Sequence, residues 1–172
     1  MSCSNYNPKN RTYPCVFKTY RKCVGKLLPN IIGSIFRELG FKAVVNHQQR
    51  NGVDVEVFDW DRRIMVLEIL NWNIGSRLYL NRKNSIISNL MSHPNCIKAL
   101  VHTQRLPSSY IKELNKNGIF SIFIGYQVVY PICYNFFKSK ATASARRPYS
   151  AVVKSHIKSK IFNLLCKPVI LI

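Results

Sequence analysis

Acidic residues are scarce in this chain of 172 residues. Seven aspartates and glutamates stand against 26 lysines and arginines, which gives a formal net charge of +19 and a sequence pI of about 10.0. Such an imbalance attracts polyanions, because each Lys or Arg that neutralises a phosphate releases a condensed counterion. We therefore expect a polyanionic partner, with nucleic acid as the first candidate and an anionic membrane surface as the second.

Sequence features that mark several other protein classes are missing too. The six cysteines form no C-x-x-C pair and no histidines stand at finger spacing, which argues against a zinc module. No run approaches the roughly 20 apolar residues that a membrane span needs, and the polar opening of the chain lacks the pattern of a secretory signal. With 47% apolar residues, the chain is typical of a folded domain. We expect an intracellular, cytoplasmic protein without a membrane span.

The spacing of the apolar residues predicts an α/β domain. Helical spacing recurs through residues 27–39, with Gly40 as a C-terminal cap, whereas period-two alternation and short apolar runs mark strands. We expect further helices at residues 76–93 and 107–118, and strands at residues 41–48, 53–58, 64–70, 96–103 and 119–130. The resulting order, α-β-β-β-α-β-α-β, indicates a mixed central β-sheet flanked by helices.

Composition divides the chain into three parts. Residues 1–25 form a polar, basic N-terminal arm, residues 26–134 the core domain, and residues 135–172 a basic C-terminal extension. Within the extension, residues 150–172 predict an amphipathic basic helix that would bind DNA, a membrane surface or a partner subunit. The simplest of these roles is packing in a homodimer.

The few acidic residues gather in one segment. Residues 52–72, GVDVEVFDWDRRIMVLEILNW, hold five of the seven, on two apolar strands joined by a charged turn. If the hairpin closes around this turn, Asp54 and Glu68 converge near one end of the sheet, one from each strand. Adjacent carboxylates repel each other unless a cation lies between them, and hard divalent cations prefer oxygen ligands. The hairpin therefore predicts a Mg²⁺ or Mn²⁺ site for work on phosphodiesters.

This pattern resembles the PD-(D/E)xK nuclease superfamily, which has the restriction-endonuclease-like fold. The likeness is closest to archaeal Holliday-junction resolvases and related archaeal or viral nucleases. It consists of Val53-Asp54 and Leu67–Leu70, with 13 residues between Asp54 and Glu68, and extends over residues 27–131. The resemblance implies a metal-dependent deoxyribonuclease, cytoplasmic or in the host cytoplasm if viral. It also implies that Asp54, Glu68 and the backbone carbonyl of Ile69 hold the metal.

Leu70 occupies the position where the family has its lysine. Some members of the superfamily carry that lysine on the next helix instead, and on this likeness Lys83 is the first candidate to assist the attacking water. Asn71, which follows the acidic strand, is the alternative.

Basic and aromatic residues near the hairpin predict a nucleic-acid surface. We expect the tryptophans Trp60 and Trp72 to stack on bases, although core packing is an equal alternative for Trp72. Six arginines would line a groove around the hairpin and contact phosphates: Arg62, Arg63, Arg77, Arg82, Arg146 and Arg147.

Structural roles stay open for several acidic residues. Asp54 would otherwise accept backbone hydrogen bonds at a strand start, and Glu68 would pair with a neighbouring arginine. Glu56 is either an accessory ligand or a salt-bridge partner, and Asp59 and Asp61 belong to the turn.

Two alternatives to an enzyme follow from the same features. A catalytically degenerate nuclease fold would bind DNA without cutting it, as the missing lysine suggests. A basic structural protein that packages nucleic acid would use the acidic hairpin only as architecture. DNA is the expected partner, and RNA stays open.

Overall fold

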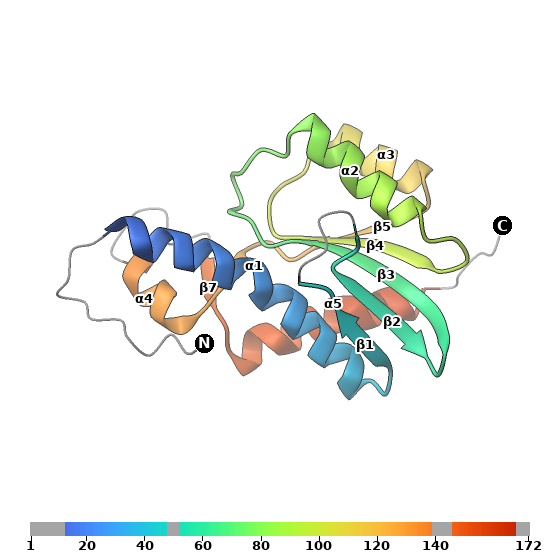
Figure 1. The fold of residues 1–172 in the computed structure, drawn as a ribbon, viewed down its shortest axis with the longest axis horizontal. Helices are drawn as coiled ribbons and strands as arrows, with labels where there is room; N and C mark the ends of the chain where they lie inside the picture. Colours follow the sequence, from blue (N-terminus) through green and yellow to red (C-terminus); the bar gives the residue numbers. More distant parts are fainter. Residues whose placement is uncertain (1–12, 48–51, 139–145, 168–172) are drawn as a thin grey trace.

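A computed structural model describes residues 13–47, 52–138 and 146–167 (Figure 1). Five strands form one sheet in the order β1-β2-β3-β4-β5: β1 Lys42–Val45, β2 Val55–Asp59, β3 Arg62–Leu70, β4 Ile97–His102 and β5 Ile119–Phe123. The pairs β1–β2 and β2–β3 are antiparallel, whereas β3–β4 and β4–β5 are parallel. The predicted mixed sheet and the order of its first eight elements are therefore confirmed.

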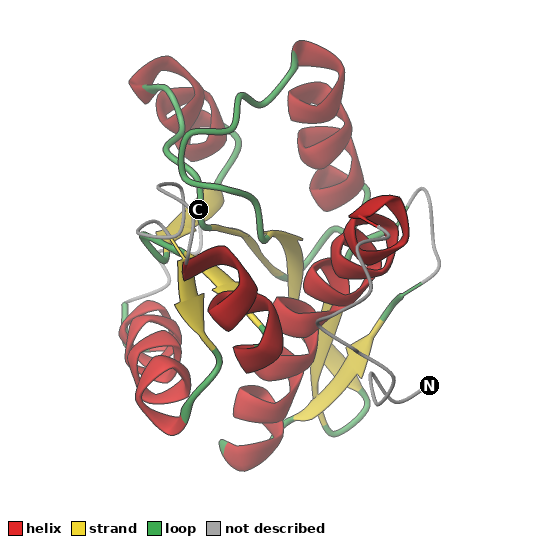
Figure 2. Ribbon diagram, turned by 90° about the vertical axis from the view of Figure 1, so that its left-hand side faces the viewer, coloured by secondary structure: helices red, strands yellow, loops and turns green. Residues whose placement is uncertain are grey.

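Helices cover both faces of this sheet (Figures 1 and 2). On one face lie α1 (Tyr13–Glu38) and α5 (Ala151–Leu165), whose buried residues share a single apolar cluster with Val55, Val57 and Leu67 of the sheet. On the other lie α2 (Leu80–Met91) and α3 (Ser108–Lys116), which pack against Val66, Leu70 and Leu100. Because side chains alternate along a strand, β3 supplies both clusters.

The central position of β3 explains its composition. It pairs with antiparallel β2 on one side and parallel β4 on the other, and every residue from Met65 to Leu70 is buried. A strand covered on both faces needs a continuous apolar run, and Glu68 interrupts that run. A buried acid at the centre of the sheet requires partners.

The helix at the N-terminus starts earlier than expected. It begins at Tyr13 and continues to Glu38, so the second half of the predicted arm is helical, while residues 1–12 lie outside the described residues. Val24, which falls inside that predicted arm, is buried at 3% exposure. The expected boundary at residue 25 therefore does not coincide with an element boundary.

In the described part of the predicted C-terminal extension, helix α5 packs into the core. The predicted basic helix is present as α5, and its buried residues at i, i+4 spacing, Val153, Ile157 and Ile161, join the α1 cluster. Two further elements precede it, α4 (Pro131–Lys138) and β7 (Arg146–Pro148). The apolar face of α5 is therefore buried against the core of the same chain.

The last predicted strand is divided in two. β5 ends at Phe123, and β6 (Gln127–Val129) pairs with β7 in a separate two-stranded parallel sheet. Gly125 lies between them with φ +90°, a left-handed conformation that glycine adopts without a Cβ clash. The bend carries the chain past the end of β3.

Candidate active site

Asp54 stands where β2 and β3 separate. Its backbone N–H still donates to Leu67 O at 2.9 Å, as in a strand pair. One step further along, its side chain replaces the backbone: Ile69 N–H donates to Asp54 Oδ2 at 2.7 Å. This bond turns the Asp54 carboxylate toward β3, where it is close enough to the Glu68 carboxyl for each to affect the other's pKa. The structure thus brings the two acids together, as the parity of the hairpin predicted.

Glu68 lies beneath helix α2 with only 1% of its surface exposed. Arg82 Nη2 donates to its Oε2 at 3.2 Å, and Asn89 Nδ2 donates to its Oε1 at 2.8 Å. The two donors are seven residues apart, about two helical turns, so they share one face of α2. Arg82 forms the outer part of the arrangement, because its side chain is 34% exposed.

Both acids are harder to ionise than usual. Burial and, second to it, the nearby Asp54 carboxylate raise the pKa of Glu68 to about 7, against the opposing effects of Asn89 and Arg82. Burial likewise raises the pKa of Asp54, although the Ile69 N–H and Arg82 favour its charged form. The pair consequently retains a proton up to about neutral pH.

The oxygens gathered here are the ligand type that Mg²⁺ and Mn²⁺ prefer. In a strand the N–H and C=O of one residue point to the same side, so the Ile69 carbonyl is directed toward Asp54, as its N–H is. A divalent cation would also relieve the repulsion that holds a proton on the pair. It would have to replace Arg82, which already neutralises Glu68. The described residues contain no group of three or more His, Cys, Asp or Glu placed to hold a metal, so water, backbone or substrate would complete the coordination.

Lys83 is not part of this cluster, which corrects its predicted role. Its ammonium lies over the Tyr110 ring, 5.3 Å from the centroid, and Tyr110 Oη donates to the Lys83 carbonyl at 3.1 Å. One residue on a helix is a rotation of about 100°, and the preceding residue, Arg82, is the one that faces Glu68.

Asn71 is a structural residue, which corrects the second candidate for assisting the water. It is 6% exposed, and its Nδ2 donates to the carbonyls of Val24 at 3.0 Å and Val128 at 2.8 Å. Its Oδ1 accepts from Val128 N–H at 2.9 Å. Three residues after Glu68, it faces the opposite side of β3, so it ties that strand to α1 and β6.

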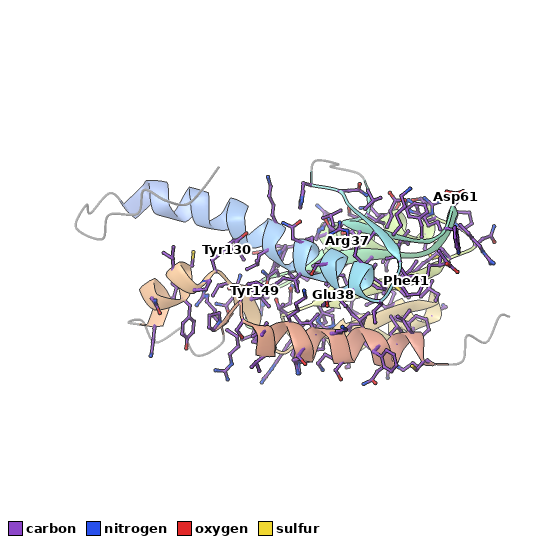
Figure 3. All side chains as sticks on the ribbon, turned by 90° about the horizontal axis from the view of Figure 1, so that it is seen from below. Arg37, Glu38, Phe41, Asp61, Tyr130 and Tyr149 are labelled. Atoms are coloured by element: carbon purple, nitrogen blue, oxygen red, sulfur yellow. The ribbon has the colours of Figure 1, made fainter. Side chains whose placement is uncertain are left out.

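The sequence predicted that six arginines line one groove around the hairpin, but the structure distributes them over separate parts of the molecule. Figure 3 shows Asp61 at the hairpin turn on the right of the molecule and Tyr149, next to β7, far to its left. Arg62 and Arg63 lie beside the turn and Arg146 and Arg147 lie in β7, while Arg77 precedes α2. Three of the six have structural partners: Arg82 bonds Glu68 at 3.2 Å, Arg63 bonds Glu56 at 2.9 Å, and Arg146 bonds Gln127 at 3.0 Å.

The structure also identifies residues that sequence reasoning missed. Asn89 was not considered, and Arg82 was expected to bind nucleic acid and not Glu68. Their spacing was the available signal, because polar residues at 82 and 89 interrupt the otherwise apolar face of α2 formed by Ile86 and Leu90. Glu56 takes the salt-bridge role, since Arg63 and Asn46 occupy its two oxygens.

The sequence matches no protein-family model, no curated protein and no solved structure. In the part of the chain that the structure describes, no helix has the length and apolar character required to cross a membrane. Function is therefore inferred from the chemistry of the Asp54–Glu68 pair and its surroundings.

Proposed function

We propose that the protein is a metal-dependent deoxyribonuclease of the restriction-endonuclease-like fold, with Asp54 and Glu68 as ligands of Mg²⁺ or Mn²⁺. The observation that carries the proposal is the meeting of two carboxyls from adjacent strands at the point where those strands separate. A net charge of +19 supports a phosphodiester substrate. The element order of the sheet agrees with the resemblance noted in the sequence.

Each residue of the cluster has a role in this proposal. When bound, a divalent cation supplies Lewis acidity toward a phosphodiester oxygen. Asp54 and Glu68 provide charge and oxygens, the Ile69 N–H fixes the Asp54 rotamer, and Asn89 orients Glu68. Arg82 is the ion-pair partner of Glu68 and, once released from it, presents its guanidinium to a phosphate, which it can bind with two parallel hydrogen bonds.

The raised pKa values give the proposed activity a pH dependence. A carboxyl must lose its proton to ligate a cation. Since the pKa of Glu68 is raised to about 7 by burial and by Asp54, the metal competes with a proton below neutrality. Activity at limiting metal is expected to rise about tenfold per pH unit below pH 7 and to level off above it.

The test is nicking of supercoiled plasmid with Mg²⁺ or Mn²⁺ and with EDTA. The isosteric variants Asp54→Asn and Glu68→Gln should each lose at least about a hundredfold in rate. Glu113→Gln is the matched control, because Glu113 is exposed on α3 and is not part of the pair. Cleavage that persists in EDTA, or in Glu68→Gln, would contradict the proposal.

A second candidate is a DNA-binding protein with this fold that does not cut. It is favoured by the burial of Glu68 at 1% exposure under Arg82 and Asn89, and by Leu70 at the position of the family's lysine. Such a protein would retard DNA equally with Mg²⁺ and with EDTA, and Glu68→Gln would bind as the wild type does. No nicking by purified wild type at pH 8 with either metal would favour this candidate.

A further inference from the structure

We propose that Trp60, at the tip of the β2–β3 hairpin, is a stacking site for an unpaired nucleobase. The inference rests on the nucleic-acid ligand of the proposed function and is independent of cleavage. It assigns a binding role to a residue about which the acidic cluster says nothing.

The Trp60 side chain is exposed to solvent, and its backbone has a strained, positive φ. Its side chain is 89% exposed, the highest value among the exposed large apolar residues described. Asp59 pairs with Arg62, so Trp60 and Asp61 form a two-residue turn in which Trp60 has φ +55° and Asp61 does not share the positive φ. The first position of such a turn ordinarily holds glycine, because a Cβ is strained there. Neither burial nor backbone conformation favours a tryptophan at this position, and this combination points to a ligand for the indole.

The surroundings of Trp60 favour a base over the phosphate backbone. The hairpin tip extends away from the helices that cover the sheet (Figures 1 and 3). Asp59 and Asp61 flank the indole, and both are exposed. Their carboxylates repel phosphates, but they accept hydrogen bonds from the amino groups that unpaired bases display. Exposed Arg62 supplies a cation for the neighbouring phosphate.

The charged surroundings argue against a protein partner for the same residue. Tryptophan anchors in protein interfaces usually lie within an apolar, water-excluding patch. Here the neighbours of the indole in the turn, Asp59, Asp61 and Arg62, are charged and exposed. A base that stacks on the indole leaves its edge free for these groups.

The position of the tip defines the class of ligand. Trp60 follows Asp54 by six residues of extended chain, or about 20 Å at roughly 3.3 Å per residue. That length corresponds to about six nucleotides at roughly 3.4 Å each. A ligand that contacts both places therefore presents unpaired bases about six nucleotides from the phosphate at the acid pair. DNA with a gap, flap or bubble beside a duplex has this property.

The experiment compares a gapped duplex with a blunt duplex of the same length, both in EDTA so that no cleavage occurs. Wild type should bind the gapped DNA more tightly, with quenching of the exposed indole. Trp60→Ala should lose about tenfold in affinity for gapped DNA and nothing for blunt DNA. Trp60→Phe should retain most of the affinity. Phe162→Ala, which removes a 53%-exposed aromatic on α5, is the control and should change neither.

A second variant separates binding from folding. Trp60→Gly should remove the same preference for gapped DNA while raising Tm by about 2 °C, since glycine relieves the left-handed strain. Equal affinities of wild type and Trp60→Ala for gapped DNA would overturn the inference, and so would an equal loss on both DNAs. Those results leave the proposed nuclease intact, whereas failure of wild type to bind any DNA would overturn both proposals.

Discussion

The two faces of the sheet bury polar groups in different ways. Toward α1 and α5 the cluster is apolar, and at its edge the Asn71 side chain bonds backbone groups of Val24 and Val128. Toward α2, β3 buries Glu68, whose partners Asp54 and Arg82 are themselves ionisable. Backbone partners do not titrate and hold the first face in one state. On the second face, ionisable partners can give up a proton or an ion pair, so Glu68 and Asp54 can accept a cation. Burying these charged groups lowers the stability of the fold.

The largest effect is expected in the apolar face. Phe36 of α1 is fully buried, and its ring packs edge-on against Phe41 with 6.4 Å between centroids. Phe36→Ala should lower the free energy of unfolding by about 4 kcal/mol, from lost burial and the cavity left behind. Urea denaturation measures the change, with Val152→Ala, at a 78%-exposed position of α5, as the control. A loss below about 1 kcal/mol would mean that α1 does not pack on the sheet as described.

The outline of both faces could be predicted from local patterns. Alternating valines at 53, 55 and 57 located β2, and period two placed Asp54 and Glu68 on the same side, so their convergence followed from the sequence. The alternation rule applies to residues that are close in sequence. It was sufficient here because Asp54 and Glu68 lie on two strands joined by a short turn.

The misassigned residues depended on contacts that local patterns do not contain. Asn71 bonds Val128, which is 57 residues away in the sequence. Val128 reaches this position because the chain bends at Gly125 and splits the last predicted strand. Lys83 and Arg82 differ by one helical step, and only the packing of α2 on β3 decides which of them reaches Glu68. The α5 helix was visible in the sequence, but the sequence alone did not show that this chain's own α1 covers it.

Asn71 tests the claim that the first face depends on fixed backbone partners. Asn71→Ala leaves two carbonyls and one N–H, those of Val24 and Val128, without their side-chain partner in a buried site. We expect a loss of about 3 kcal/mol in unfolding free energy that does not vary with pH. The control is Asn73→Ala. The Asn73 side chain accepts one exposed 3.3 Å hydrogen bond from Gly75 N–H, so its loss should lower the unfolding free energy by less than about 0.5 kcal/mol. If Asn71→Ala abolished nicking while the fold stayed as stable, the residue would have a catalytic role after all.

The smallest effect has the opposite sign and a defined pH window. Burial and the Asp54 carboxylate raise the pKa of Glu68 from 4.5 to about 7, so the folded state holds this proton more tightly than the unfolded chain does. The resulting stabilisation is complete below pH 4.5 and is lost as pH rises through about 7. Glu68→Gln cannot titrate, so it should match wild type near pH 4 and exceed its stability by up to about 3 kcal/mol at pH 8.5.

Unfolding free energies in urea across pH 4 to 8.5 measure this difference. Glu113→Gln, at an exposed position of α3, is the matched control and should change stability by less than about 0.5 kcal/mol. Greater stability of the wild type at pH 8.5 would show that the Arg82 ion pair outweighs the burial of Glu68. In that case the polar groups on both faces would stabilise the fold, and replacing Arg82 by a metal ion would be unfavourable.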